Sequence, residues 1–307
     1  MPSYRTGTVT SILAERPGLQ RVEVDGQRAY VLTQLIGAVA VGDRVVMNTT
    51  AVDLGLGTGG WHVVHWNLER EQWSEPGPGH EMKLRYTSLQ LDSGVTQGTT
   101  PRPGTPVVAC FLHSQVACVA RAFKERTPER RLAYVMTEGG CLPIAVSDLV
   151  AELCAEGLLD TTVTVGQAFG GDREAVNLRH AFEVVGDHDA VVVGMGPGSL
   201  GTGSALGFSG IEVADVIDAA ADTGCTPVVA LRYSEADPRE RHQGLSHHTS
   251  TVLELARPAR VEVPVPRGQP HFTLERHHVV EVDVPDVSDW PYTSMGRTPR
   301  EDPKFFA

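Results

Sequence analysis

Two hydrophobic patterns divide the chain. Residues 4–66 hold short stretches in which apolar and polar positions alternate, whereas continuous apolar runs separated by amphipathic segments begin after residue 105. Alternation indicates strands with one buried face, and continuous runs indicate strands buried on both faces. We therefore expect a small β-barrel domain over 1–75, a linker and hairpin over 76–105, an α/β domain over 106–257, and strands with an extended tail over 258–307.

The N-terminal region predicts a compact barrel of the OB or SH3-like kind. Its Asp25-Gly26 pair is a strong hairpin signal, because both central positions of such a turn need positive φ. No segment of this region has a convincing helical period. The expected strands are residues 7–13, 21–24, 28–33, 44–49 and 61–66.

The middle of the chain alternates between predicted strands and predicted helices. The strands are residues 107–112, 132–136, 161–165, 190–193 and 227–231, and the helices are residues 114–125, 145–155, 174–185, 210–221 and 248–256. This alternation is typical of a doubly wound, mostly parallel, Rossmann-like sheet with helices on both faces.

The flanking segments carry weaker patterns. Residues 84–91 are expected to form an extra strand or hairpin arm, and residues 260–265 and 278–284 alternate cleanly. Because each of these last two has one apolar face, we expect an antiparallel edge or a return to the N-terminal β domain. The proline-rich residues 285–307 predict an extended arm that crosses to a neighbouring subunit, as in a homodimer.

Composition excludes some partners. The chain has 26 Lys and Arg against 38 Asp and Glu, a net charge of -12, which argues against nucleic acid and against an anionic membrane surface. No apolar run approaches the roughly 18 residues of a membrane span, and the first residues lack the layout of a signal peptide. We expect a cytoplasmic protein whose five cysteines are reduced, since no C-x-x-C pair occurs.

A glycine-rich loop follows the predicted strand 190–193. Gly196, Gly198 and Gly201 satisfy G-x-G-x-x-G, in which missing Cβ atoms let backbone N–H groups approach a phosphate or another anion. The loop departs from a dinucleotide fingerprint, because Pro197 removes one N–H and the loop follows the fourth strand of the domain rather than the first. A purely structural reading, glycines for chain reversal and tight packing, stays open.

The same residues offer a second cofactor interpretation. Residues 193–198 resemble the G-x-G-P-G turn of tetrapyrrole-type methyltransferases, which implies S-adenosylmethionine as a cofactor. That family places the turn after its first strand. A nicotinamide, a flavin and S-adenosylmethionine therefore stay open, and the cofactor is left unknown.

Polar and glycine residues follow every predicted parallel strand. Ligands of open parallel sheets bind beyond the carboxyl ends of the strands, where the strand order reverses. The sequence therefore predicts a small-molecule site at this edge. The candidate ligand-binding residues are Ser114, Thr137, Gly139, Gly140, Gly170, Gly171, Gly194, Gly196, Gly198, Ser199, Gly201, Arg232, Ser234, Glu235 and His247.

Three residues at this edge are candidates for catalysis. Glu138 has the chemistry of a general base, and Cys141 that of a nucleophile with His113 as its base. A small buried Cys141 packing under its loop is the alternative. Residues 232–250 predict a charged lid over the site, or else a solvated loop before a capped helix.

No local metal-binding motif is present, and a metal site assembled from residues distant in the sequence stays open. The adjacent pairs His247-His248 and His277-His278 are expected to diverge, and no H-E-x-x-H, C-x-x-C or EF-hand pattern occurs. The chain also lacks a P-loop and a G-x-S-x-G elbow, which removes P-loop NTPases and ordinary α/β-hydrolases.

Four segments resemble a bacterial family known only as a domain of unknown function: residues 41–52, 112–115, 137–140 and 194–198. The resemblance spans nearly the whole chain. It implies no established activity, so no catalytic residue is carried over from it.

Three functions remain open from the sequence. The first is binding of a small anionic or nucleotide-like metabolite by an enzyme of the transferase or hydrolase type. The second is a non-catalytic metabolite sensor or assembly module. The third is a structural protein whose crevice is plugged by Met195, Leu200 and Phe208.

Overall fold

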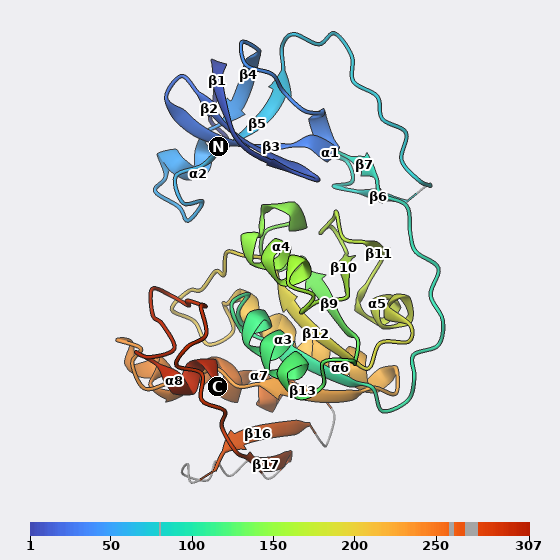
Figure 1. The fold of residues 1–307 in the computed structure, drawn as a ribbon, viewed down its shortest axis with the longest axis vertical. Coiled ribbons are helices and arrows are strands. Elements are labelled where there is room, and N and C mark those ends of the chain that lie inside the picture. Colours follow the sequence, from blue (N-terminus) through green and yellow to red (C-terminus); the bar gives the residue numbers. More distant parts are fainter. Residues whose placement is uncertain (80, 258–260, 268–275) are drawn as a thin grey trace. The chain divides into compact units, whose positions relative to one another are not determined.

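The computed structural model describes residues 1–79, 81–257, 261–267 and 276–307 (Figure 1). The chain divides into two compact units. The first comprises Met1–Val95 with Pro143–Asp148, and the second comprises Thr96–Leu142 with Leu149–Ala307. Within the described ranges, no helix combines the length and the apolar character that crossing a membrane requires.

The first unit contains a closed five-stranded barrel, which confirms the predicted barrel and has the strand number of an OB fold. Around the barrel the strands are β1 (Tyr4–Arg16), β2 (Leu19–Val24), β3 (Gln27–Leu32), β5 (His62–Asn67) and β4 (Arg44–Asn48). Asp25 and Gly26 both have positive φ at the β2–β3 turn, as the sequence predicted. Val22, Val24 and Val31 are fully buried in the barrel core.

Two four-residue helices also lie in this unit, α1 (Thr33–Ile36) and α2 (Thr50–Asp53). Of the two alternatives for residues 84–91, the continuous strand is wrong, whereas a short hairpin is present with residues 84–90 as its loop. The structure has only the short pair β6 (Met82–Lys83) and β7 (Leu91–Asp92), and Leu84 and Tyr86 between them have positive φ. Tyr86 is fully exposed, so the alternating pattern has no face to bury against.

The second unit is built on an eight-stranded sheet in which every pair is parallel. In spatial order the strands are β11 (Arg173–Ala175), β10 (Thr161–Val165), β9 (Leu132–Thr137), β12 (Ala190–Met195), β8 (Pro106–Cys110), β13 (Thr226–Ala230), β16 (Glu262–Pro266) and β17 (His278–Val282). The five continuous apolar runs all became strands of this sheet. Their buried side chains explain why: β9, β10 and β12 are buried along their whole length.

Helices connect these strands. They are α3 (Gln115–Arg126), α4 (Asp148–Ala155), α5 (Leu178–Val185), α6 (Val213–Asp222) and α7 (His247–Leu255), with short 3₁₀ turns η1 (Ile144–Val146), η2 (Ser209–Glu212) and η3 (Glu240–His242). Right-handed crossovers place α3 and α4 on one face of the sheet and α5 and α6 on the other. Consistent with this, α5 contacts α6 (Figure 1).

The helix predicted over residues 174–185 begins later than expected. Asn177 caps it by accepting a hydrogen bond from the backbone N–H of His180, and the helix starts at Leu178. The residues before the cap, Arg173–Ala175, instead form the edge strand β11 beside β10.

The two C-terminal strands join the main sheet in parallel, so the predicted antiparallel edge and the predicted return to the barrel are both wrong. Arg260, the first residue of one predicted strand, lies outside the described residues. In the described part of β16, the pairing with β13 consists of Val228 opposite Glu262. Pro264 and Pro266 have no N–H to donate to a neighbouring strand.

The C-terminal tail packs on its own α/β unit rather than extending away from it. Trp290, Phe305 and Phe306 are buried, the last two around the short helix α8 (Pro303–Phe306). The hydroxyl of Ser234 donates to Asp302 at 2.6 Å, and Arg297 lies 3.1 Å from the same carboxylate. The extended arm was therefore a wrong prediction, and the homodimer that it suggested stays a prediction.

Candidate functional site

The strand order creates a crevice between β8 and β12. These neighbours lie side by side, yet the chain leaves β8 for α3 on one face and leaves β12 for α6 on the other. Outgoing connections on opposite faces open a space at the carboxyl ends of two adjacent strands, which is where open α/β sheets bind ligands. The crevice therefore lies at the carboxyl ends of the strands, the edge of the sheet at which the sequence predicted a site.

A pocket of about 410 Å³ lies there, within the range of small-molecule sites. We call it the strand-end pocket. Its lining comes from four segments: Leu112, His113 and Ser114 after β8; Met195, Gly196, Pro197, Gly198 and Ser199 after β12; Leu149 and Glu152 of α4; and Pro291, Tyr292, Thr293, Ser294 and Met295 of the tail. The tail contribution was not foreseen from the sequence.

His113 is a neutral, oriented imidazole in this pocket. Its Nδ1 lies 3.0 Å from the carbonyl oxygen of Met195, so Nδ1 carries the proton in that contact. Burial lowers the pKa of His113, although the hydrogen bond to Met195 opposes that effect. Beside it, the hydroxyls of Ser114 and Ser294 are 2.8 Å apart. The pocket therefore offers hydroxyl groups together with a histidine that is uncharged at neutral pH.

The glycines of the predicted loops fall into two groups. A Cβ on Gly140 would overlap the carbonyl oxygen of Gly196, and a Cβ on Gly196 would overlap the carbonyl oxygen of Cys141. The loops after β9 and β12 thus interlock through their backbones, and the structural reading holds for these glycines. Gly194 likewise packs on Cys110. In contrast, Gly198 has φ +95° and open space around it.

Gly201 is also open, but it lies outside the pocket lining. In the third loop, after β10, the glycine N–H groups already donate hydrogen bonds to residues of the same chain. The N–H of Gly170 donates to Glu174 at 2.8 Å, and the N–H of Gly171 donates to Thr164 at 3.2 Å. These two predicted ligand donors therefore stabilise their own loop.

Glu212 is a candidate acid or base that the sequence analysis missed. It ends η2 and accepts a hydrogen bond from the hydroxyl of Thr137 at the end of β9. Burial raises the pKa of Glu212 to about 7, and the charge of Glu138 adds to the shift. A Cβ on Gly139 would overlap its carboxylate. Thr137 and Gly139, two predicted ligand-binding residues, thus contact the carboxyl group of Glu212.

The two other predicted catalytic residues have different surroundings. Glu138 accepts a hydrogen bond from the backbone N–H of Gln167 at 2.6 Å, which ties it to the loop after β10. Burial raises the pKa of Cys141 to about 11, so this residue is a protonated thiol near neutral pH. All five cysteines are free, as predicted. The thiolate that nucleophilic attack requires is therefore not favoured at Cys141.

Arg232 is buried beside the pocket, with 5% of its surface exposed. Its Nη1 lies 2.8 Å from Nδ1 of His248, and its Nη2 lies 3.6 Å from the sulfur of Met295, which lines the pocket. Burial and the neighbouring charge of Arg239 lower the pKa of Arg232 to about 10. Among the described residues, no carboxylate pairs with its guanidinium.

Two predicted ligand-binding residues near Arg232 instead hold the tail. Ser234 donates to Asp302, and Glu235 pairs with Lys304 at 2.5 Å. Both side chains therefore hold the C-terminal tail, and neither lines the strand-end pocket.

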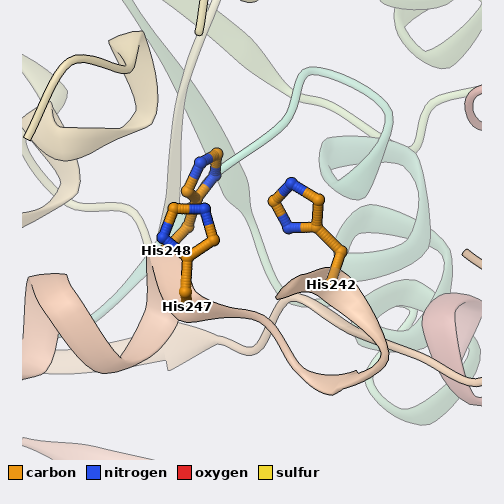
Figure 2. A group of neighbouring side chains, drawn as sticks. All are labelled: His242, His247 and His248. Atoms are coloured by element: carbon orange, nitrogen blue, oxygen red, sulfur yellow. The ribbon is translucent and has the colours of Figure 1, made fainter. Parts of the chain in front are cut away.

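His247 belongs to a cluster with His242 and His248. Figure 2 shows the three rings close together, with His242 coming from a separate turn and the other two from the start of α7. The ring centroids of His247 and His248 are 4.3 Å apart, so the prediction that this pair diverges is wrong. Successive residues of a helix are about 100° apart rather than on opposite faces, which lets both rings turn to one side.

The family comparison covers both units. A family described as "Protein of unknown function (DUF3866)" matches residues 28–307. The chain belongs to the DUF3866 family. This confirms the resemblance seen in the four sequence segments, and it brings no activity with it. No curated protein and no solved structure matches the DUF3866 chain.

Two features of this DUF3866 protein had only faint sequence signals. Glu212 is 75 residues from the threonine that binds it, and nothing near it in the sequence marks it. The histidine cluster has a signal in hindsight, the spacing of His242 five and six residues before His247 and His248. All three histidines lie within the predicted lid segment, residues 232–250, and the pair His247-His248 alone does not reveal the third ring.

Proposed function

We propose that this DUF3866 protein binds a small anionic, nucleotide-like metabolite in the strand-end pocket. The pocket lies at the point where the strand order reverses, and it combines a glycine-containing loop with the hydroxyls of Ser114 and Ser294. The open backbone at Gly198 and Ser199 suits close approach by a phosphate or carboxylate.

The observation that carries the proposal is the buried Arg232, which forms no ion pair in the described part of the chain, although the charge of Asp237 acts on it. A buried guanidinium without an anionic partner is costly, and arginine binds carboxylate and phosphate in a bidentate manner. Met295 lies against this guanidinium and also lines the pocket. In our proposal, a change in the Met295 side chain gives the anionic part of the ligand access to Arg232.

Met295 carries a second sign of such a role. Its φ of 50° lies in the left-handed region, which is unfavourable for a residue other than glycine and is often maintained at ligand sites. Its neighbour Ser294 is hydrogen bonded to Ser114. The strained residue therefore sits where the tail completes the pocket.

A specific observation also favours a catalytic role. Burial raises the pKa of Glu212 to about 7, a value that suits a general acid or base of a transferase or hydrolase, although Glu212 is not among the residues that line the strand-end pocket. A non-catalytic sensor would use the same pocket and show binding without turnover. The structural reading has less support, because Leu200, one of its three plugging residues, is 77% exposed.

Native mass spectrometry of the untagged full chain tests the proposal. We expect a co-purified small molecule, or binding of added inorganic phosphate or adenosine monophosphate, that is lost in Gly198→Val. Gly203→Ala is the matched control, because Gly203 lies in the same loop with open space and outside the pocket lining. Circular dichroism checks that both variants fold. Equal binding by folded Gly198→Val and wild type would overturn the proposal.

A further inference from the structure

The cluster of His242, His247 and His248 lies outside the lining of the strand-end pocket, and His248 contacts Arg232 of the proposed binding site. One nitrogen atom from each ring lies within 4.8 Å of the nitrogen atoms from the other two. Three imidazoles that converge in this manner need a physical explanation, because isolated polar rings gain little from packing on each other in a protein interior.

The local fold brings the three rings together. The pair β14 (Tyr233–Ser234) and β15 (Gly244–Leu245) forms a short antiparallel ladder that encloses η3 and leads directly into α7. His242 therefore ends one turn while His247 and His248 begin the next helix. Ser246 caps that helix by accepting a hydrogen bond from the backbone N–H of His248.

Two of the rings are fixed by contacts that leave a nitrogen for another partner. Nδ1 of His242 lies 2.7 Å from the hydroxyl of Ser246, which leaves Nε2 for a ligand. Phe208 stacks on the ring of His248 at 3.7 Å with an interplanar angle of 2°. The contact of His242 is of the kind that commonly orients metal-binding histidines, through the ring nitrogen that does not bind the ion.

The third ring carries an unsatisfied atom. Nε2 of His247 is buried and has no hydrogen-bond partner in the part of the chain that the structure describes. A buried polar atom without a partner costs roughly 1–3 kcal/mol. Arg232 bonds to His248 and Ser246 bonds to His242, so neither of them satisfies Nε2 of His247, and a bound species is the simplest partner for it.

We propose that His242, His247 and His248 bind a late first-row divalent metal ion, with Zn²⁺ the best fit. Imidazole nitrogen is a preferred ligand of Zn²⁺, and three protein ligands leave a fourth position for water or an anion. Tetrahedral Zn–N bonds of about 2.0–2.1 Å place neighbouring nitrogens about 3.3 Å apart.

Arg232 sets the chemistry of this site. A guanidinium only donates, so Nδ1 of His248 accepts from Arg232 and the ring proton is on Nε2. The ion therefore takes Nδ1 in place of the guanidinium, or the proton moves to Nδ1, the guanidinium turns away and the ion binds Nε2. The ligand type disfavours Mg²⁺ and Ca²⁺, which prefer oxygen ligands and would gain nothing from three imidazoles. The charge of Arg232 favours an anion in the fourth position, since it would neutralise the ion and the guanidinium together.

The test measures metal binding directly, without any assay of activity. Untagged full-length protein is stripped with a chelator, dialysed against Zn²⁺ and analysed for metal content, and its Co²⁺ form is examined by visible absorption. We expect one ion per chain and the intense absorption of tetrahedral Co²⁺. His242→Gln and His247→Gln should each weaken Zn²⁺ binding more than about a hundredfold, since even an outer partner of a ligand accounts for about 10–100-fold.

His65→Gln is the control, because His65 lies in the barrel unit and contacts Tyr4 rather than the cluster. Glutamine keeps a polar side chain at each site, and circular dichroism checks folding. The proposal is overturned if wild type binds less than one ion per chain at micromolar Zn²⁺. It is equally overturned if folded His242→Gln and His247→Gln retain the affinity of the wild type.

Discussion

Replacing Glu212 by glutamine should remove much of the pH dependence of the stability of the α/β unit. Burial raises the pKa of this carboxyl group in the folded protein, so folding favours its neutral form. The stabilisation that the neutral Glu212 carboxyl group contributes is therefore complete below its pKa in the unfolded chain. It is lost as the pH rises through its pKa in the folded protein, about 7. A glutamine at this position stays neutral throughout and still accepts the hydrogen bond from Thr137.

The magnitude follows from the difference between the two pKa values. The folded value is about 7 and the ordinary value is 4.5. At 1.36 kcal/mol for each pKa unit, the wild type loses about 3 kcal/mol across the whole range. Between pH 5 and pH 8 the loss is about 2.5 kcal/mol, because part of the titration lies below pH 5. The unfolding free energy of Glu212→Gln should not show this decrease.

Urea unfolding followed by far-ultraviolet circular dichroism measures the effect. All helices of eight or more residues connect the strands of the α/β sheet, so the helical signal follows this unit. The quantity to compare is the change in unfolding free energy between pH 5 and pH 8 in wild type and Glu212→Gln. Glu129→Gln, at an exposed carboxylate, controls for the loss of one charge. Parallel pH profiles for wild type and Glu212→Gln would refute the reasoning.

Two further predictions concern the loops at the strand ends. Gly140→Ala should destabilise the protein by about 1–3 kcal/mol, because its Cβ overlaps the carbonyl oxygen of Gly196, whereas Gly201→Ala, in open space, should leave the melting temperature nearly unchanged. Equal melting temperatures for these two variants would contradict the interlocking of the loops. Because burial raises the pKa of Cys141 to about 11, its alkylation by iodoacetamide should be slow at pH 7 and rise about tenfold per pH unit up to that value. Mass spectrometry of the labelled peptide checks this, and fast labelling at neutral pH would restore Cys141 as a candidate nucleophile.

The hydrophobic pattern predicted the framework of the α/β unit well. The strand expected over residues 161–165 has those bounds in the structure, because five consecutive buried residues leave little room for another assignment. Helix starts were less accurate where a short edge strand preceded the cap, as before Leu178. The C-terminal strands alternated as predicted, but alternation does not say which neighbour a strand joins, so their parallel pairing was not predictable from it.

Several residues that the strand-end pattern singled out, among them His113, Ser114 and Gly198, line the strand-end pocket, and their role in binding stays a prediction. The importance of Glu212 depends on burial by distant residues, which no local pattern records. The tail residues Ser294 and Met295 were missed because a proline-rich segment looks unstructured until its aromatic residues find a surface to pack on.

The junction between β13 and β16 has a consequence for local unfolding. In the described residues one register pair joins these strands, whereas five pairs join β16 to β17. Pro264 and Pro266 withhold two N–H groups from the ladders of β16. We therefore expect β16 and β17 to be coupled more weakly to β13 than to each other. We expect the β16–β17 ladder to open and exchange its amide hydrogens as a separate unit, while β8, β9 and β12 exchange only through much rarer, larger openings.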